Sequence, residues 1–409
     1  MRVIRVGLVG YGMYGADVVA GSLWDLHRNG LAPYLDRIGL DDWCPAYQDV
    51  RVRTVAIGTR SPDSGTRAKG DFVNNAGDAP EVFSGEEPWV DMLEAADLDV
   101  LVVATPDNLH YEPIMAALEA GVHVVAEKPL CLSAEEAREI VGLSESKGLI
   151  VGVDMHKRYD PDHIRIFRDL VRHMGSPIHA RGVLEEPLEV STVTFKWAEE
   201  SDPFSYVGIH WIDLFCHYLQ LRPSALYATG QKRLLLDEFG IDAFDATQVT
   251  VVHECGTAVT YDNNWITPPD FEGPVNQESE LVMSRGKVES DSQYRGLRYW
   301  IETGGSRTSN THFFRRVRRP DGSACHLGYG KDSLVDCLER VARVRLHGAS
   351  AADLAGTYPD ARSQLLPCAI VDAARAVMRR NHQRLTDGQA PTVTAAFDDD
   401  AYRLVGDQE

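Results

Sequence analysis

The sequence has little cysteine and no long hydrophobic run. Its seven cysteines among 409 residues are scattered, and no two form a CxxC pair. A dispersed, odd set is typical of reduced thiols, and the spacing of Cys and His matches no zinc site, so no metal is expected. No apolar stretch approaches the roughly 20 residues that span a bilayer, and no leader pattern precedes the first strand-like segment. We therefore expect a cytoplasmic protein with no membrane partner.

Positive charge is also scarce. Lys and Arg number 41 against 61 Asp and Glu, which gives a formal net charge of −20. An acidic surface repels phosphate backbones, which argues against nucleic acid as a partner. Hydrophobic residues make up 44% and charged residues 25%, as in ordinary globular proteins. A chain of this length and composition predicts two or three globular domains.

The first 150 residues alternate strand-like and helix-like segments. Residues 3–9, 52–57, 99–104 and 122–126 are apolar runs, as expected for strands buried on both faces of a sheet. Strands separated by helices predict a doubly wound parallel sheet. Since a βαβ unit needs only about 30 residues in all, residues 25–49 are an insertion in the first crossover. Whether this insertion packs on its own domain, on a partner subunit or at a ligand-binding mouth stays open.

After residue 151 strand-like segments dominate, and they predict a large, mostly antiparallel sheet. The expected strands are residues 178–184, 190–197, 224–229, 247–253, 258–264, 280–283 and 286–291. The expected helices are residues 210–219, 333–344 and 365–379. The acidic tail, residues 398–409, is expected to fray. The predicted domains are residues 1–150 and residues 151–409, with the C-terminal helices free to pack back on the first domain.

A glycine-rich turn follows the first predicted strand. Residues 10–15 are GYGMYG, a GxGxxG motif between a strand and a helix in the first βαβ unit. Gly10 permits the tight turn, Gly12 lets a pyrophosphate approach the backbone, and Gly15 allows close packing of helix on strand. The N-terminus of the following helix offers free N–H groups to the phosphates. The motif predicts a dinucleotide site formed by Gly10, Tyr11, Gly12, Met13 and Tyr14.

The end of the second strand bears on the choice between the two nicotinamide dinucleotides. An acidic residue there binds the ribose 2′-hydroxyl, whereas an arginine favours a 2′-phosphate. Residues 57–61 are IGTRS, so no acid stands at the strand end, and Thr59 and Arg60 are placed to receive a phosphate. Asp63 is close enough to bind a ribose instead. The sequence favours NADP and leaves NAD open.

Two later strands also end in polar residues at the carboxyl edge, where open α/β sheets bind ligands. The first ends in ATPDN, residues 104–108, which places Thr105, Pro106 and Asn108 at the expected cofactor site. His110 follows and suits a local cap as well as a ligand contact.

The second of these strands ends in Glu127-Lys128-Pro129. The proline keeps Lys128 extended and directs it to the crevice where a nicotinamide would lie. A partly desolvated lysine there gives up its proton more easily and can exchange it with a hydroxyl or a carbonyl group. A lysine paired with a local carboxylate is the alternative interpretation. We expect Glu127 and Lys128 to contact the cofactor.

Residues 10–15, 104–110 and 127–129 together resemble the Gfo/Idh/MocA family, named after glucose–fructose oxidoreductase, inositol dehydrogenase and MocA. Residues 208–213, GIHWID, match a fourth segment of that family, G-x-H-x-x-D. The resemblance spans most of the chain. It implies an NAD(P)-binding Rossmann domain and a second α/β domain with an open sheet, whose outer face forms a dimer or tetramer contact. It also implies catalytic roles for Lys128 and His210.

The sequence departs from the family four residues before His210, where relatives usually carry Asp and this chain has Tyr206. Positions i and i+4 share a helix face, so Tyr206 would reach the same pocket. A phenol with an ordinary pKa near 10 is a poor base at neutral pH, which leaves Lys128 as the main proton-transfer residue. Asp213 either orients His210 or forms a cap or inter-helix bond. The expected substrate contacts are Lys128, His156, Arg158, Lys196, Tyr206, His210 and Asp213.

The resemblance implies a nicotinamide-dependent oxidoreductase. Hydride would pass between nicotinamide C4 and a hydroxyl or keto carbon of a sugar, a cyclitol or a sugar derivative, including a nucleotide-linked one. Lys128 would be the proton donor or acceptor. Two alternatives stay open: an enzyme that uses tightly bound NAD(P) transiently for epimerisation or glycoside cleavage, and a non-catalytic regulator that senses a dinucleotide or sugar. A small-molecule substrate and a homodimer or homotetramer are expected.

Overall fold

The computed structural model describes residues 1–268, 271, 273, 275–291, 297–301, 305–318 and 324–406. The chain divides into two compact units, and neither is continuous in sequence. The first unit comprises Met1–Cys131, Glu135–Asp160 and His312–Gln364. The second comprises Leu132–Ala134, Pro161–Thr311 and Leu365–Glu409. The predicted domain ranges, residues 1–150 and 151–409, stay a prediction.

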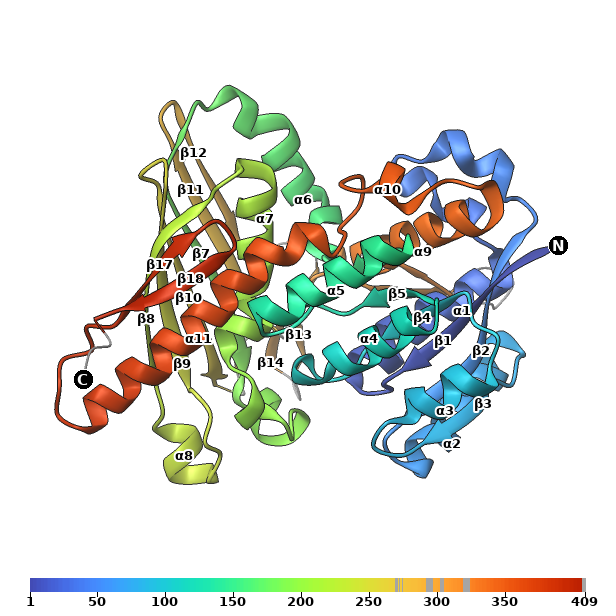
Figure 1. The fold of residues 1–409 in the computed structure, drawn as a ribbon, viewed down its shortest axis with the longest axis horizontal. Coiled ribbons are helices and arrows are strands. Elements are labelled where there is room, and N and C mark those ends of the chain that lie inside the picture. Colours follow the sequence, from blue (N-terminus) through green and yellow to red (C-terminus); the bar gives the residue numbers. More distant parts are fainter. Residues whose placement is uncertain are drawn as a thin grey trace. The chain divides into compact units, whose positions relative to one another are not determined.

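A six-stranded parallel sheet forms the centre of the first unit (Figure 1). In spatial order its strands are β3 (Glu81–Ser84), β2 (Val50–Thr59), β1 (Arg2–Val9), β4 (Val100–Val103), β5 (His123–Ala126) and β6 (Val151–Val153). Strands β4 and β5 are buried along their whole length, as expected for a sheet covered on both faces. The strand order reverses between β1 and β4, which is where ligands bind in such sheets. The predicted doubly wound Rossmann sheet is confirmed.

Helices connect these strands. They are α1 (Ala20–Asn29), α2 (Pro62–Ala76), α3 (Pro88–Ala95), α4 (Tyr111–Glu119) and α5 (Ala134–Lys147). Helix α1 packs on β2 and beside α2, whereas α3 packs beside α4. The crossovers β1–α1–β2 and β4–α4–β5 run in opposite directions along the sheet, so right-handed connections place their helices on opposite faces. A long late helix, α9 (Tyr329–His347), also contacts β5 and is followed by the short α10 (Ala351–Leu354).

The insertion between α1 and β2 packs on α9. It consists of short 3-10 turns rather than longer helices, at Ala32–Tyr34, Asp36–Ile38 and Asp41–Tyr47. Arg37 forms two hydrogen bonds of 2.8 and 2.7 Å with the Asp332 carboxylate, and the Tyr47 hydroxyl donates to Glu339 at 3.0 Å. The Arg343 guanidinium lies 3.9 Å from the centre of the Trp43 ring. The insertion therefore packs on α9 and helps to stabilise the first unit, to which both belong.

A mixed sheet of eight strands forms the second unit. In spatial order its strands are β12 (Gly286–Asp291), β11 (Asn276–Met283), β7 (Pro177–Pro187), β10 (Ala258–Thr267), β9 (Ala246–His253), β8 (Pro223–Gln231), β17 (Thr394–Asp398) and β18 (Ala401–Val405). Only the β7–β10 pair is parallel among these neighbours. The large, mostly antiparallel sheet is confirmed.

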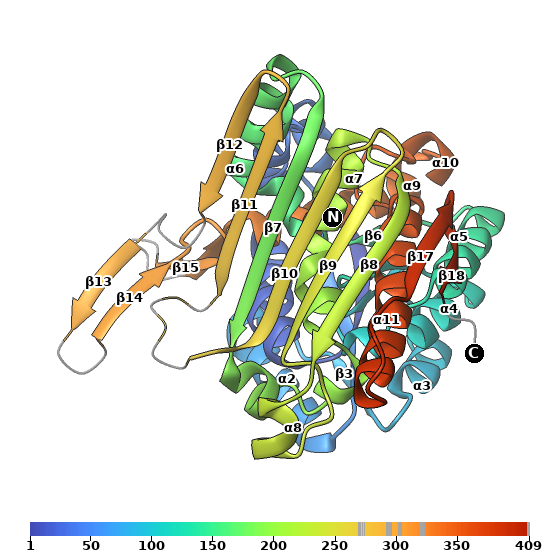
Figure 2. The same ribbon diagram turned by 90° about the vertical axis from the view of Figure 1, so that its left-hand side faces the viewer.

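The helices of the second unit are α6 (Pro161–Ile164), α7 (Ile209–Leu219), α8 (Leu234–Phe239) and α11 (Leu365–Thr386). Helix α11 packs on β8 and contacts α7. Figure 2 shows the strands in front of α7 and α11, with no described helix drawn over the near face. Two hairpins complete the described elements: β13 (Leu297–Ile301) with β14 (Gly305–Ser309), and, in the first unit, β15 (Arg315–Arg318) with β16 (Ala324–Leu327).

Two expectations for the second unit are wrong. The expected strand at residues 190–197 is instead a π-helical turn, Val190–Thr194. The β-branched run favours a strand, but the hydroxyls of Ser191 and Thr192 donate to the Leu188 carbonyl at 3.1 and 2.9 Å and stabilise a turn. The acidic tail forms β17 and β18 instead of fraying, because β17 adds to the sheet edge and buries Ala395. Residues 407–409 lie outside the described residues.

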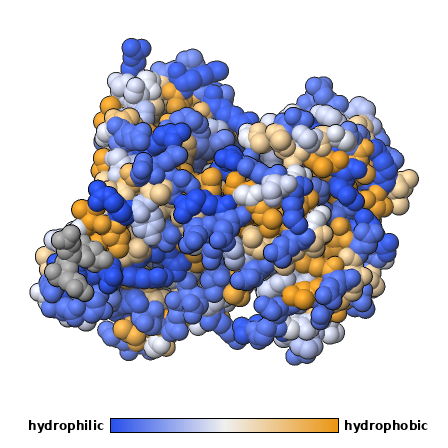
Figure 3. All heavy atoms as spheres, viewed as in Figure 1, coloured by the Kyte–Doolittle hydropathy of each residue, from blue (hydrophilic) through white to orange (hydrophobic). Residues whose placement is uncertain are grey.

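The surface drawn in Figure 3 is mostly hydrophilic, with hydrophobic side chains in small groups. Among the described residues, no helix is both long enough and apolar enough to cross a membrane.

Candidate active site

The glycine-rich turn lies at the carboxyl end of β1. Gly10 has a φ of 95°, and a Cβ on it would lie 2.2 Å from the Ala104 carbonyl oxygen. A Cβ on Gly15 would lie 2.6 Å from the Gly10 oxygen, so close packing requires both glycines. Gly12 differs, because it is exposed and a Cβ there would have nothing within 4 Å. This open space beside Gly12 fits a ligand that approaches the backbone closely.

The other residues of the turn point in different directions. Met13 is 51% exposed. Tyr11 is buried and its hydroxyl donates to Asp71 on α2 at 2.9 Å. Tyr14 is half-buried and its hydroxyl donates to Asp154 Oδ2, beyond the end of β6, at 2.8 Å. The turn is therefore tied to a residue that follows β6.

At the end of β2, Thr59 and Arg60 have protein partners. The buried Thr59 hydroxyl donates to the Ser61 carbonyl at 2.9 Å. Arg60 is exposed and pairs with Glu86, which follows β3, at 3.1 Å. Asp63 is exposed in the first turn of α2. An incoming 2′-phosphate would compete with Glu86 for Arg60, so this surface does not by itself distinguish NAD from NADP.

The residues after β4 divide into anchored and accessible groups. The Thr105 hydroxyl donates to the Leu109 carbonyl at 3.0 Å. Both ring nitrogens of His110 face backbone carbonyls, those of Pro129 at 2.7 Å and Thr105 at 3.0 Å. Burial lowers the pKa of His110 to about 4, so the ring is neutral. His110 thus clamps the Lys128–Pro129 turn, whose peptide bond is cis. Pro106 precedes a 3-10 turn, Asp107–Leu109, which carries Asn108.

Glu127 and Lys128 follow β5 directly and are buried, with 8% and 5% of their surfaces exposed. The Lys128 amide donates to Glu127 Oε2 at 3.3 Å. The buried Lys128 therefore lies at the same edge of the sheet as the glycine turn.

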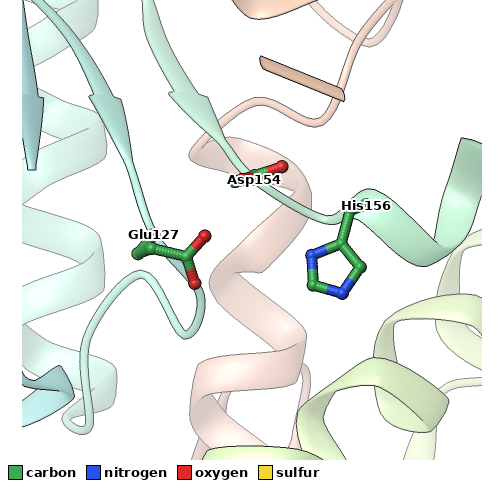
Figure 4. Close-up of side chains that lie close together, drawn as sticks. All are labelled: Glu127, Asp154 and His156. Atoms are coloured by element: carbon green, nitrogen blue, oxygen red, sulfur yellow. The ribbon is translucent and has the colours of Figure 1, made fainter. Parts of the chain in front are cut away.

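A carboxyl pair lies beside this lysine. Figure 4 shows Glu127, at the end of β5, with its carboxyl group directed toward Asp154 and His156, which follow β6. Ligand atoms of the three buried residues lie within 4.8 Å of one another. Burial, followed by the negative charge of Asp154, raises the pKa of Glu127 well above its ordinary value. Burial also raises the pKa of Asp154. Because the Lys128 charge already acts on both carboxyl groups, we treat them as a proton-holding pair and not as metal ligands.

Two other expected substrate contacts lie after β6. His156 is buried, its ring stacks on Tyr14 with centroids 6.1 Å apart, and burial lowers its pKa well below the ordinary value. Arg158 is buried, and its guanidinium donates to the Ser363 hydroxyl at 3.3 Å.

The remaining expected residues belong to the second unit. His210 and Asp213 are buried on α7, with 5% and 2% exposed. Tyr206 lies in the preceding π-helical turn, Phe204–Gly208, and its ring is 4.7 Å from that of Phe195 and 5.6 Å from that of Trp197. Lys196 is exposed. Tyr206 therefore has a packing role in an aromatic cluster, whatever its part in chemistry.

The first unit offers two kinds of feature that fit a nicotinamide dinucleotide. One is the open space at Gly12. The other is a set of three buried oxygens that accept no hydrogen bond from any described residue: Asn108 Oδ1, Glu127 Oε1 and Asp154 Oδ1. All three follow strands β4 to β6 at the ligand-binding edge. Such oxygens are suited to accept hydrogen bonds from the hydroxyl or amide donors of a ligand.

The sequence did not identify the hydroxyl of Tyr14 as the partner of Asp154. Asp154 directly follows β6, and its position after the last parallel strand was the signal available. Its partnership with Tyr14 joins residues 140 positions apart, which no local pattern reveals.

Comparisons with known proteins agree with this geometry. The sequence profile of the GFO_IDH_MocA oxidoreductase family, NAD-binding Rossmann fold, matches residues 4–155. An uncharacterized oxidoreductase, YdgJ of Escherichia coli, is 27% identical over 259 residues, 55% of this chain and 71% of that protein. The scyllo-inositol 2-dehydrogenase (NADP⁺) IolW of Bacillus subtilis is 32% identical over 163 residues, 40% of this chain and 36% of that protein.

Solved structures share the fold over nearly the whole chain. GenD2 from gentamicin A biosynthesis, in complex with NAD, has a TM-score of 0.68 at 18% identity, covering 97% of both chains. The scyllo-inositol dehydrogenase of Lactobacillus casei, with NAD(H) and scyllo-inositol, has a TM-score of 0.66 at 17% identity, covering 93% of this chain and 98% of that one. Residues 4–155 are therefore similar to the NAD-binding domain of the Gfo/Idh/MocA oxidoreductases, and the solved structures show that nearly the whole chain shares their fold.

Proposed function

We propose that the protein is an NAD(P)-dependent dehydrogenase or reductase that acts on a hydroxyl or keto carbon of a sugar, a cyclitol or a sugar derivative. One observation carries the proposal: a buried lysine, Lys128, lies at the same sheet edge as a glycine turn with open space beside Gly12. The relatives support the substrate class, since they include enzymes named for scyllo-inositol and for D-glucosides.

The bound dinucleotide would supply or accept a hydride at nicotinamide C4. In alcohol oxidation the neutral amine of Lys128 takes the hydroxyl proton, and in reduction its ammonium group returns one to the carbonyl oxygen. Proton transfer from a positioned group contributes about 10²–10⁴-fold. Holding the two reactants in the correct orientation contributes the larger share of the acceleration.

The roles of the other residues follow from the family resemblance. His210 would position the substrate oxygen, with Tyr206 beside it. The further contacts we assign to substrate are His156, Arg158, Lys196 and Asp213. The cofactor would bind the turn formed by Gly10, Tyr11, Gly12, Met13 and Tyr14. It would also contact Thr59, Arg60, Thr105, Pro106, Asn108, His110 and Glu127.

NADP is the cofactor we favour, because Arg60 follows β2 and no acid stands at the strand end. The first experiment is titration of the purified protein with NADPH and NADH, followed by nicotinamide fluorescence, after recording the absorbance of the protein as isolated. Nucleotide retained through purification would favour transient use of a bound cofactor, as in epimerisation or glycoside cleavage.

The catalytic role of Lys128 is tested by Lys128→Ala on a panel of cyclitols and sugars. We expect turnover to be lost while the dissociation constant of the cofactor stays nearly unchanged. Lys147→Ala is the matched control, because Lys147 is exposed and its ammonium group donates to the Glu119 carbonyl at 2.7 Å. Turnover near the wild-type rate in Lys128→Ala would remove the catalytic assignment.

The assembly we propose is a homodimer or homotetramer that uses the uncovered face of the eight-stranded sheet. Alternate residues along β9 and β10 are exposed or half-buried on that face, and polar side chains such as Gln248 and Asp262 are among them. Light scattering during gel filtration tests the oligomeric state, and a monomer would contradict it. A cytoplasmic location stays a prediction.

A further inference from the structure

Glu127 and Asp154 form a buried carboxyl pair whose members have different partners. Asp154 Oδ2 accepts a hydrogen bond of 2.8 Å from the Tyr14 hydroxyl. Glu127 Oε2 accepts a longer bond of 3.3 Å, from the Lys128 amide. The other oxygen of each carboxyl group is buried and accepts no bond from the described residues. The short bond from Tyr14 favours the ionised form of Asp154 over that of Glu127.

Two ionised carboxylates this close and this buried repel each other strongly, so the pair binds a proton more tightly than an isolated carboxylate does. The backbone fixes their separation, since the Asp154 amide donates to the Ala126 carbonyl at 2.8 Å. This bond holds the two backbones side by side, and the burial of both side chains limits how far the carboxyl groups can separate. Holding one proton between them is the remaining way to relieve the repulsion.

We propose that Glu127 and Asp154 share one proton, held mainly by Glu127, and that the single negative charge on Asp154 stabilises the ammonium form of Lys128. Asp154 is then a positioning residue for the proton transfer, acting through Lys128. Tyr14 selects Asp154 as the ionised member. The link to Lys128 rests on the proposed function, whereas the sharing of the proton does not.

The titratable groups around the carboxyl pair do not cancel its negative charge. In the segment that follows β6, His156 is neutral because burial lowers its pKa. Lys157 and Asp160 lie near His156 and carry opposite charges. From α9, burial raises the pKa of Cys337, so its thiol is neutral.

The two remaining titratable groups are neutral as well. After β4, His110 is uncharged, since its pKa is lowered to about 4. In the glycine turn, burial raises the pKa of Tyr14, so its phenol keeps its proton. In the proposed state, Lys128 and Asp154 are then the opposite charges that act on each other within this cluster.

The proton balance of the reaction then has a definite form. In alcohol oxidation the substrate O–H bond would break and its proton would join the Lys128 amine. The C–H bond of the carbon that bears this oxygen would break as well, and a bound nicotinamide would accept the hydride. The ammonium that forms is stabilised by the Asp154 carboxylate, and the proton on Glu127 stays where it is. The amine must be neutral before each turnover, so the oxidation rate falls as pH decreases through the titration of Lys128.

The sharing of the proton is tested without catalysis, by infrared spectroscopy of the full chain at neutral pH. A protonated buried carboxyl group gives a C=O stretch that carboxylates lack. We expect this band in the wild-type protein and its loss in Glu127→Gln. The band should weaken or disappear in Asp154→Asn as well, because the repulsion that holds the proton is gone. A missing band in the wild type, or a band that Glu127→Gln keeps, would overturn the assignment. So would a metal ion found at one equivalent in the purified protein.

The link to Lys128 is tested by the pH profile of oxidation. Asp154→Asn removes the negative charge, so the acidic limb should move to lower pH by about one unit or more. Glu127→Gln replaces the neutral carboxyl group by a neutral amide, which is also a hydrogen-bond donor. The acidic limb of this variant should therefore stay at the wild-type pH, even if its oxidation rate changes. Tyr14→Phe should move the acidic limb in the same direction by a smaller amount. This variant replaces Asp154→Asn in the test if Asp154→Asn fails to fold. Asp169→Asn controls for loss of a surface charge.

An unmoved limb in both Asp154→Asn and Tyr14→Phe would refute the link. Absence of turnover in the wild type on every substrate would instead contradict the proposed function, and the infrared result would still decide whether the proton is shared.

Discussion

Replacing Lys331 should destabilise the first unit more than any exposed lysine would. Lys331, on α9, is 1% exposed, and its ammonium lies 2.8 Å from Asp25 Oδ2, on α1, which is fully buried. The same ammonium lies 3.4 Å from the centre of the Tyr34 ring. One lysine therefore joins the first helix, the insertion and α9. In Lys331→Met the Asp25 carboxylate would lose this ammonium and stay buried.

Removing one member of a buried ion pair costs about 3–5 kcal/mol. Arg28 stays beside Asp25, at 2.9 Å, so we expect a value near the lower end, about 3 kcal/mol. For a unit of this size, each kcal/mol lowers the melting temperature by about 2–4 °C. Lys331→Met should therefore melt about 6–12 °C below the wild type.

The measurement is thermal and urea unfolding, followed by circular dichroism, at pH 7. Lys287→Met is the control, since Lys287 pairs with Glu289 and Glu280 on an exposed face and its loss should leave the melting temperature unchanged. A drop of less than about 1 kcal/mol in Lys331→Met would refute the reasoning, because a buried carboxylate without its ammonium cannot be that well tolerated.

The pH dependence gives a second readout of the same pair. Burial raises the pKa of Asp25, but hydrogen bonds from His326 and Lys331 outweigh it, and the net pKa lies below the ordinary value. The contribution of Asp25 is then complete above about pH 4, where the unfolded carboxyl is ionised, and is lost as pH falls further. At the alkaline end the pair weakens as well, because burial lowers the pKa of Lys331 to about 8. Without Lys331 the pKa of Asp25 rises, so the acid loss of stability should begin at higher pH.

The remaining predictions concern the cofactor. Gly12→Ala should keep the melting temperature, since its Cβ meets nothing within 4 Å, and should weaken NADPH binding at least tenfold by fluorescence titration; Gly15→Ala, whose Cβ would lie 2.6 Å from a carbonyl oxygen, should lose stability instead. A stable Gly12→Ala protein with full affinity would contradict cofactor approach at this turn. Glu86→Gln releases Arg60 and should tighten NADPH binding about two- to fivefold while leaving NADH unchanged. An equal effect on both nucleotides would contradict a phosphate contact by Arg60.

Features carried by local patterns were predictable from the sequence. The continuous apolar runs of β4 and β5 and the glycine motif after β1 predict the parallel sheet, because burial on both faces and a tight turn each leave a local signature. The packing of the insertion was not predictable, since Arg37 and Asp332 are 295 positions apart. Nothing near Arg37 in the sequence identifies that partner.

The errors have a physical cause as well. Residues 190–194 have the composition of a strand, but the back-bonding of two hydroxyls to one carbonyl decided the local conformation. The tail carries acidic residues typical of a frayed end, yet Asp399, with a φ of 55°, forms the tight turn between β17 and β18. In both cases a side chain that favours turns was more decisive than the average composition of the segment.

The late position of α9 has a consequence for how the protein is made. During synthesis, the six parallel strands leave the ribosome long before residues 312–364, which complete the same unit. Until then the Asp25 carboxylate, which is buried in the folded unit, lacks its partner ammonium group. The apolar surface that α9 covers is also exposed. The nascent first unit should therefore depend on chaperones or stay loosely folded until residues 312–364 have emerged. Its parallel strands are expected to be the part most prone to aggregate when translation is interrupted before that point.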